Sequence, residues 1–216
     1  MEIKNGVLTS GVENALNEIE NLIVPSVING EKVTSIGENA FYCGFNIKNV
    51  TLPDSVTTIE DYAFCDLMGG VGGVSIPDSV TSIGEGAFYH CRYIKSIIIP
   101  DGVTEIKAKT FEYCESLESI TIPDSVTSID NSAFEECTSL KTLIYGGKTY
   151  NATSDTITQI VMLKSLRKQY NLSQRGLSDC TGIPTRTIED WETGKRTAPD
   201  YMPGLIEAKL QISKNK

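Results

Sequence analysis

The residues of this chain whose types could support catalysis or metal binding are its cysteines, one histidine and a row of aspartates. The histidine, His90, directly precedes Cys91. Adjacent residues of an extended chain point to opposite sides, so this pair is poorly placed to act as nucleophile and base. The sequence also has no CxxC pair, no phosphate-binding glycine loop and no Ser-His-Asp set. We therefore expect no enzyme activity, no metal site and no cofactor.

Three of the six cysteines recur at a fixed interval, each three residues after a phenylalanine: Cys91, Cys114 and Cys137. Stacked strands lie about 5 Å apart, so geometry alone does not exclude a disulfide between them. A row of three leaves one cysteine unpaired, however, and the acidic N-terminal segment lacks the apolar stretch of an export signal. We favour reduced cysteines that pack in the core over a disulfide framework.

Aspartates recur in the same way, after Leu-Pro or Ile-Pro, at Asp54, Asp78, Asp101 and Asp124. Stacked carboxylates could bind a cation. Alternatively, each aspartate could accept a hydrogen bond from the backbone of its own turn, which is the commoner use of aspartate at such a position. We favour the turn.

The fixed interval reflects an internal repeat, because Ile76, Ile99 and Ile122 are 23 residues apart. The three units that start at these positions each have Ile-Pro-Asp, Val-Thr-x-Ile and a phenylalanine, and an apolar-x-x-apolar-x-apolar triplet occurs six times along the chain. The phenylalanines are Phe41, Phe64, Phe88, Phe111 and Phe134. Residues two apart on a strand share a face, so each triplet predicts a short strand with two inward side chains. No unit can bury these residues alone, and stacked units would bury them as one column, which predicts a solenoid.

The pattern IP-x-x-V-T-x-I-G-x-x-A-F-x-x-C resembles that of BspA-like leucine-rich repeat proteins, over roughly residues 2–150. The resemblance implies a curved, right-handed solenoid of short parallel strands, with a parallel sheet along one face. Residues 1–17 would cap its open end, with a hairpin turn at Asn5 and Gly6. We expect an inserted turn from Ile28 to Lys32, a bulged rung from Met68 to Gly73 and the last coil at Tyr145.

The outward positions of the predicted strands carry small polar side chains that would form a shallow surface. Such a surface suits a protein or peptide partner better than it suits chemistry. The residues that we assign to this protein-interaction surface are Thr51, Ser75, Ser96, Ile98, Ser119, Thr121 and Thr142.

The period changes to a helical one after residue 155, where apolar residues recur three and four apart. Ser173 is a suitable N-cap for a second helix through Cys180, and Gly182 would end that helix. Pro184 would start a third helix that ends near Gly194. A fourth would open at Pro199 or Pro203 and run through Leu210. We therefore predict a solenoid over 1–150, a linker over 151–155 and a small all-α domain over 156–216.

This C-terminal segment resembles the Cro/C1-type helix-turn-helix over about 50 residues. The matching residues are Leu172, Ser173, Gln174, Leu177, Gly182, Ile183, Ile188, Trp191, Glu192, Gly194 and Pro199. The segment departs from the pattern at Ser178, where alanine is usual, and at Gly176, which weakens a helix by about 1 kcal/mol.

The resemblance implies that the third helix enters the major groove of DNA with its first turns over base edges. By that comparison Thr185, Arg186 and Thr187 would read bases. Ser173, Gln174 and Arg175 would contact phosphate or a nearby base, and Lys195 and Arg196 would contact phosphate. Ile188, Trp191, Leu177 and Ile183 would form the core.

Charge supports two units with different partners. The net charge of the whole chain is −9. Ten Lys/Arg and seven Asp/Glu from Asp155 onward give +3, which leaves −12 for the preceding residues. Glu189 and Asp190 are unfavourable on a helix that approaches phosphate, unless they face away or accept a hydrogen bond from cytosine. An alternative is therefore a helix-turn-helix kept only for packing or dimerisation.

These observations predict a cytoplasmic DNA-binding transcriptional regulator, with no membrane segment, whose repeat domain senses or docks a protein or peptide. Its partners would be double-stranded DNA and an unknown protein, and a homodimer is a further possibility. The alternative is a repeat-based interaction or cell-surface protein, exported by a signal missing from this sequence, in which the helical tail is structural.

Overall fold

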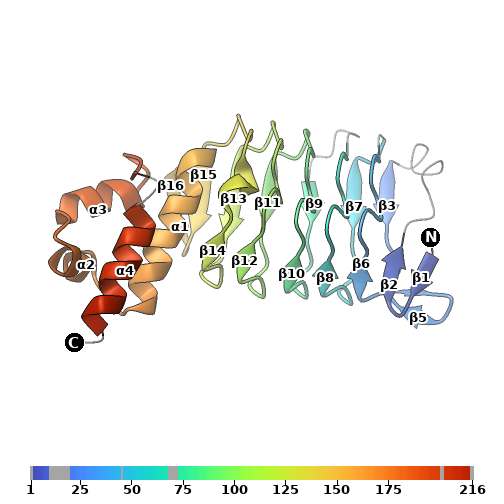
Figure 1. The fold of residues 1–216 in the computed structure, drawn as a ribbon. Helices are drawn as coiled ribbons and strands as arrows, with labels where there is room; N and C mark the ends of the chain where they lie inside the picture. The colour runs from blue at the N-terminus through green and yellow to red at the C-terminus, as the bar shows by residue number, and fades with distance from the viewer. Residues whose placement is uncertain (1, 10–19, 45, 68–72, 200–201, 215–216) are drawn as a thin grey trace.

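The computed structural model describes residues 2–9, 20–44, 46–67, 73–199 and 202–214. It is an elongated coil of short strands with a cluster of helices at its C-terminal end (Figure 1). The solenoid and the helical domain predicted from the sequence are therefore both present. In the part of the chain that the structure describes, no helix is long and apolar enough to cross a membrane.

Two ladders of parallel strands run along the solenoid, one more than the single sheet that the family resemblance implied. The first ladder contains β3 (Asn21–Ile23), β7 (Asn49–Thr51), β9 (Gly73–Ser75), β11 (Ser96–Ile98), β13 (Ser119–Ile122) and β15 (Thr142–Tyr145). The second contains β2 (Val7–Thr9), β6 (Ser35–Ile36), β8 (Thr58–Ile59), β10 (Ser82–Ile83), β12 (Glu105–Ile106) and β14 (Ser128–Ile129). Strand pairing among the described residues is interrupted between β9 and β11 in the first ladder and between β10 and β12 in the second, so each ladder consists of two sheets. The second ladder forms because Val-Thr-x-Ile is also extended and also repeats.

The register of the ladders follows the sequence repeat. Ile97 pairs with Ile120, and Ile120 with Leu143, at the interval seen in the sequence. The described members of the predicted inward set are buried, and the first members of two triplets, Ile19 and Val71, lie outside the described residues.

The repeat phenylalanines form a stack through the centre of the coil. Neighbouring ring centroids, from Phe41 to Phe134, are 5.3–5.5 Å apart with interplanar angles of 6–10°. Each ring is at most 1% exposed. The spacing of the rings is close to the separation of neighbouring strands, because each coil contributes one ring.

The repeated cysteines form a second buried row. Their Sγ atoms donate to the carbonyl oxygen of a phenylalanine in the preceding coil: Cys91 to Phe64 at 3.0 Å, Cys114 to Phe88 at 3.2 Å and Cys137 to Phe111 at 3.0 Å. All six thiols are free in the structure. Burial raises the pKa of Cys91 and of Cys137 to about 12, and it also raises the pKa of Cys114. The arrangement agrees with packing cysteines.

The predicted hairpin turns are present at the N-terminal end. β1 (Glu2–Lys4) pairs antiparallel with β2 across Asn5 and Gly6, which have φ of 53° and 79°. The inserted turn is a hairpin between β4 (Val27–Ile28) and β5 (Glu31–Lys32). The bulged rung falls largely on 68–72, and the remainder of the predicted cap on 10–17, which lie outside the described residues.

The solenoid ends in a β-hairpin, and the chain continues from it directly into the first helix. β16 (Lys148–Asn151) pairs antiparallel with β15 across Gly146 and Gly147. Thr153 then caps α1 (Ser154–Gln169), and its backbone N–H donates to the Thr156 hydroxyl. The segment 151–155, predicted as a linker, thus contains the end of a strand, a helix N-cap and the first residues of a helix.

Helix α1 belongs to two hydrophobic cores at once. Its residues Ile157, Ile160 and Val161 pack into the core of the solenoid. Leu163 and Leu166 pack with the helices that follow, α2 (Gln174–Thr181), α3 (Thr185–Glu192) and α4 (Met202–Lys214). The last coil of a solenoid would otherwise expose its apolar end, and α1 covers it. The same helix therefore packs against both units.

Candidate nucleic-acid interface

Helices α2 and α3 are connected by a short glycine-containing turn. The Ser173 hydroxyl caps α2 by accepting the N–H of Gly176 at 3.0 Å. Gly182 ends the helix with φ of 76°, a conformation that favours glycine, and Pro184 is the N-cap of α3. These caps are the predicted ones, because they depend on neighbouring residues only. The side chains of Leu177, Ile188 and Trp191 form the core of the unit, with Ile183 packed against it.

The predicted base-reading residues lie at the exposed start of α3. Thr185 and Arg186 are exposed, and Thr187 is half-buried. Among the described residues, none forms a hydrogen bond or ion pair with the guanidinium of Arg186. Figure 1 shows α2 and α3 at the end of the molecule farthest from β1 and the rest of the solenoid. The first turn of α3 is thus accessible to a large ligand.

The two carboxylates of α3 differ in environment. Asp190 is only 7% exposed, and its oxygens lie 3.4 Å from the ammonium of Lys195 and 3.5 Å from the guanidinium of Arg196. Glu189 is exposed. One of the two carboxylates therefore faces away from the outer surface. It also pairs with the two cations predicted to contact phosphate, which remain largely exposed themselves.

A buried carboxylate, Glu192, connects three helices. It is 1% exposed and forms a two-point ion pair with Arg167 of α1, in which Nη2 lies 2.8 Å from Oε2. The hydrogen bonds to Glu192 raise the pKa of Arg167. The Gln174 side-chain amide of α2 donates to the same oxygen at 2.9 Å. The ion pair joins α1 to the end of α3, and the hydrogen bond from Gln174 fixes the start of α2 against the same carboxylate.

Two of the residues predicted to contact phosphate belong to hydrogen-bonded caps or networks within the helical domain. The side chains of Ser173 and Gln174 form hydrogen bonds within the helical domain. Arg175 is exposed, and no described residue forms a hydrogen bond or ion pair with its side chain. Sequence reasoning missed Arg167, which lies 25 residues from Glu192. No local spacing indicates a contact of that length.

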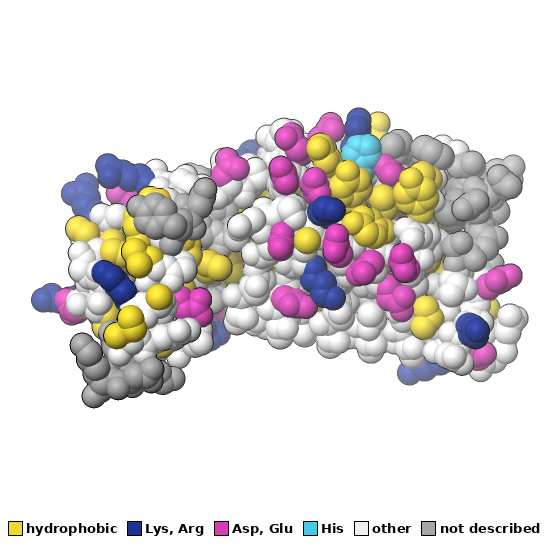
Figure 2. Space-filling view, viewed as in Figure 1, with side chains coloured by type: hydrophobic (Ala, Val, Ile, Leu, Met, Phe, Trp, Pro, Cys, Tyr) yellow, Lys and Arg dark blue, Asp and Glu magenta, His cyan; other side chains and the backbone are white. Residues whose placement is uncertain are grey.

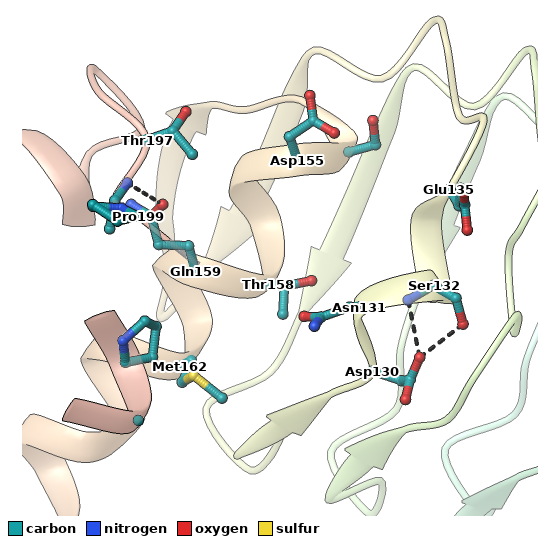
Figure 3. Close-up of a pocket in the computed structure, with 14 residues that line it drawn as sticks. Asp130, Asn131, Ser132, Glu135, Asp155, Thr158, Gln159, Met162, Thr197 and Pro199 are labelled. Atoms are coloured by element: carbon teal, nitrogen blue, oxygen red, sulfur yellow. Dashed lines mark hydrogen bonds between the residues drawn. The ribbon is translucent and has the colours of Figure 1, made fainter. Parts of the chain in front are cut away.

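Sequence reasoning also missed Gln159. From α1, its Nε2 donates to the carbonyl of Trp191 at 3.1 Å, and its Oε1 accepts the N–H of Ala198 at 2.6 Å. Figure 3 shows this side chain reaching toward the Thr197–Pro199 segment. Gln159 thereby positions both ends of the segment that carries Lys195 and Arg196.

The groove in Figure 3 separates the end of the solenoid from the helices and has a volume of about 830 Å³. Its lining includes η2 (Asn131–Phe134), the first half of α1 and the residues before α4. Its described lining contains three carboxylates, Asp130, Glu135 and Asp155, and no lysine or arginine. A groove of this charge does not favour a phosphate backbone.

The residues of the predicted protein-interaction surface all lie on strands of the first ladder. Ser96, Ser119 and Thr142 are register neighbours, as are Ile98 and Thr121. Thr51, Ser75 and Ser96 are exposed, Ile98 is 68% exposed, and Ser119, Thr121 and Thr142 are half-buried. The structure thus brings these residues together on one face.

A second solenoid surface was not predicted. Next to the repeat phenylalanines lies a row of aromatic side chains, of which Tyr62 and Tyr89 have ring centroids 6.3 Å apart and Tyr89 and Tyr113 5.7 Å apart. Figure 2 shows exposed apolar side chains gathered beside the histidine, with acidic side chains around them. The signal in the sequence is a tyrosine one or two residues from a repeat phenylalanine, at Tyr42, Tyr62, Tyr89 and Tyr113.

Fold and site together define a repeat solenoid joined to a helix-turn-helix unit, and comparison with protein families agrees. Residues 12–70 and 70–181 match the BspA type leucine rich repeat region, in six copies, and residues 163–202 match a helix-turn-helix family. The chain belongs to the BspA-type leucine-rich repeat family. No curated protein matches it.

Solved structures resemble the solenoid. A leucine rich cell surface protein from Faecalibacterium prausnitzii is 35% identical, with a TM-score of 0.55, over 60% of this chain. The match spans 33% of the length of that protein. The leucine rich repeat protein of T. pallidum is 23% identical, with a TM-score of 0.53, over 66% of this chain and 74% of its own. The second likeness concerns the fold alone.

Proposed function

We propose that this protein is a DNA-binding transcriptional regulator in which the helix-turn-helix reads duplex DNA and the solenoid senses or docks a protein or peptide. The observation that carries the proposal is the free first turn of α3. Arg186 is exposed and unpaired among the described residues, and α3 lies at the end of the molecule. Asp190, which would repel phosphate, is buried against two cations.

Three classes of contact follow from this geometry. Thr185, Arg186 and Thr187 read base edges, and Arg186 suits the two acceptors of guanine. Arg175, Lys195 and Arg196 contact phosphates. Ser173 and Gln174 lie at the start of α2, where the backbone N–H groups of the helix favour binding of a phosphate.

The test is selection of bound duplexes from a random pool with the full chain, followed by affinity measurement at several salt concentrations. Arg186→Ala removes discrimination at one guanine, worth about 1–3 kcal/mol. Lys195→Ala instead weakens all duplexes alike and lowers the salt slope by about 1. Lys32→Ala, at the opposite end of the molecule, is the matched control. Binding that is absent at low ionic strength, or insensitive to salt, contradicts the proposal.

We also propose that the protein is cytoplasmic and not an enzyme. Both matched families have non-enzymatic folds, and a DNA reader acts where DNA is. The exposed Cys180 and the buried free cysteines fit a reducing compartment. Six thiols titrated in unfolded protein without reductant support this location, and a lower count contradicts it. Sedimentation with and without a palindromic duplex tests the further proposal of a homodimer.

A second candidate function is a cell-surface interaction protein with a structural helical tail. It is favoured by the similarity to the cell surface protein of Faecalibacterium prausnitzii and by the contact of α1 with the solenoid core. An export signal preceding this sequence in the gene, together with no duplex binding, supports this candidate over the first.

A further inference from the structure

A second hollow, of about 320 Å³, lies at the junction of the two units. The last coil contributes Asp124 and the β15–β16 hairpin, and the helical domain contributes the second half of α1 and the connection to α2. Its described lining contains one carboxylate, Asp124, and four cations, which are Lys148, Lys164, Arg167 and Lys168. Its charge is thus opposite to that of the groove in Figure 3.

The three lysines outnumber the one carboxylate of the described lining, so the hollow keeps a net positive charge. Arg167 is paired with Glu192, but no ion pair holds a lysine of this hollow within the described residues. The Lys164 ammonium donates to the Tyr150 hydroxyl at 2.5 Å and lies 3.8 Å from the centroid of that ring. The Lys168 ammonium donates to the backbone carbonyl of Asp124 at 3.4 Å. These partners carry no charge, so the hollow attracts an anion.

The hollow is continuous with the start of α2. Asn171 and Leu172 line it, and Ser173, the N-cap of α2, follows directly. The start of α2 is where a DNA strand would pass in the proposed complex. Phosphates follow one another every 3.4 Å of axis along a strand, so a strand held there presents further phosphates to neighbouring residues.

We propose that this hollow binds phosphates of the DNA backbone, so that the solenoid contributes Lys148 to a nucleic-acid surface completed by Lys164 and Lys168. The inference rests on the proposed function. It assigns the junction a role beyond that of a connection. The solenoid is acidic overall and repels DNA at long range, and a lysine at its edge offsets that repulsion where the strand comes nearest.

The test compares the full chain with the double variant Lys148→Gln/Lys168→Gln in binding to a random-sequence duplex at several salt concentrations. Each lost phosphate contact lowers the slope of log K against log salt by about 0.9, so the double variant is expected to lose about 1.8. The control Lys4→Gln/Lys32→Gln makes the same charge change on two exposed lysines at the N-terminal end. It is expected to leave the slope unchanged.

The single variants locate the contribution of the solenoid. Lys148→Gln alone is expected to lower the slope by about 0.9. A loss confined to Lys168→Gln would overturn the participation of the solenoid, and equal slopes for the double variant and its control would overturn the inference while leaving the proposed function intact. A wild-type chain that binds no duplex overturns both. Unchanged thermal unfolding midpoints show that each variant is folded.

Free phosphate is the other source of the same anion. Calorimetric titration with inorganic phosphate at constant ionic strength distinguishes it from DNA. Saturable binding that is lost in the double variant, together with an unchanged duplex slope, assigns the hollow to a free phosphate compound and overturns the DNA assignment.

Discussion

In the solenoid the main buried positions recur from coil to coil, whereas in the helical domain each buried contact occurs once. The phenylalanine stack extends through five rings, and each inner ring has two like neighbours. The helical domain depends on one buried ion pair and on single polar side chains such as Gln159. Loss of an inner ring of the stack disturbs two neighbouring coils, and loss of an end ring disturbs one. Loss of any member of the network in the helical domain leaves its partners unpaired.

The charges of the two units differ in the same way. The solenoid carries a net negative charge, and the helical domain carries a small net positive charge. The exposed lysines and arginines occupy particular places, such as the segment after α3 and the hollow at the junction. Position, more than net charge, therefore distinguishes the surface suited to DNA.

The largest expected effect is on the stack. Phe88→Ala removes a fully buried ring between two others and is expected to lower the free energy of unfolding by about 3–5 kcal/mol. Tyr93→Ala, on an aromatic ring that is 48% exposed, should change it by less than about 0.5 kcal/mol. Urea unfolding measures both, and equal costs would contradict the continuous core.

The ion pair is the corresponding test of the helical domain. Arg167→Ala leaves Glu192 buried without its cation, and we expect a loss of about 3 kcal/mol, near the low end for such pairs because the arginine is partly exposed. The double variant Arg167→Met/Glu192→Leu should recover most of the loss, since no charge is then left unpaired. Urea unfolding followed by helical circular dichroism distinguishes the two outcomes, and a double variant as unstable as the single one would contradict this account.

Substitution of two glycines tests whether the helical domain is packed more closely at its junction with the solenoid than at its far end. Gly194 and Gly182 both have positive φ, but a Cβ on Gly194 would lie 2.6 Å from the carbonyl oxygen of Asn151, while one on Gly182 would meet no atom within 4 Å. Gly194→Ala is expected to cost about 2 kcal/mol and Gly182→Ala about 1 kcal/mol. The two costs become similar if the helical domain is not packed on β16, and thermal unfolding of both variants decides between these outcomes.

The smallest effect concerns the cysteine row and appears only in alkali. The folded thiol of Cys137 has its pKa raised from 9.0 to about 12 by burial. The unfolded thiol ionises above pH 9, so the stabilisation from the protonated form is complete below pH 9 and is lost as the pH rises toward 12. Cys137→Ala should reduce the loss of unfolding free energy between pH 7 and pH 10 by about 1 kcal/mol. Cys180→Ala, at an exposed position, should leave that loss unchanged.

The sequence predicted the features that depend on short spacing. The repeat of apolar residues and phenylalanines predicted the coil, and Ser173, Gly182 and Pro184 predicted the limits of α2 and α3, because caps and turns involve residues close in the chain. The assignment of Thr185, Arg186 and Thr187 to base reading stays a prediction, although the structure leaves the first turn of α3 free.

The sequence alone determines the period of the solenoid, the helical character of the tail and the residue types of the proposed DNA-binding surface. Each of these depends on residues that are close together in the chain. The tertiary structure decided the rest: that α1 fills the end of the coil, that Arg167 pairs with Glu192, and that Lys148 of the solenoid shares a hollow with Lys168. These contacts join residues 20 or more apart with no regular spacing, so their geometry depends on how the last coil and the helices pack. The orientation of α3 relative to the solenoid depends on the same packing.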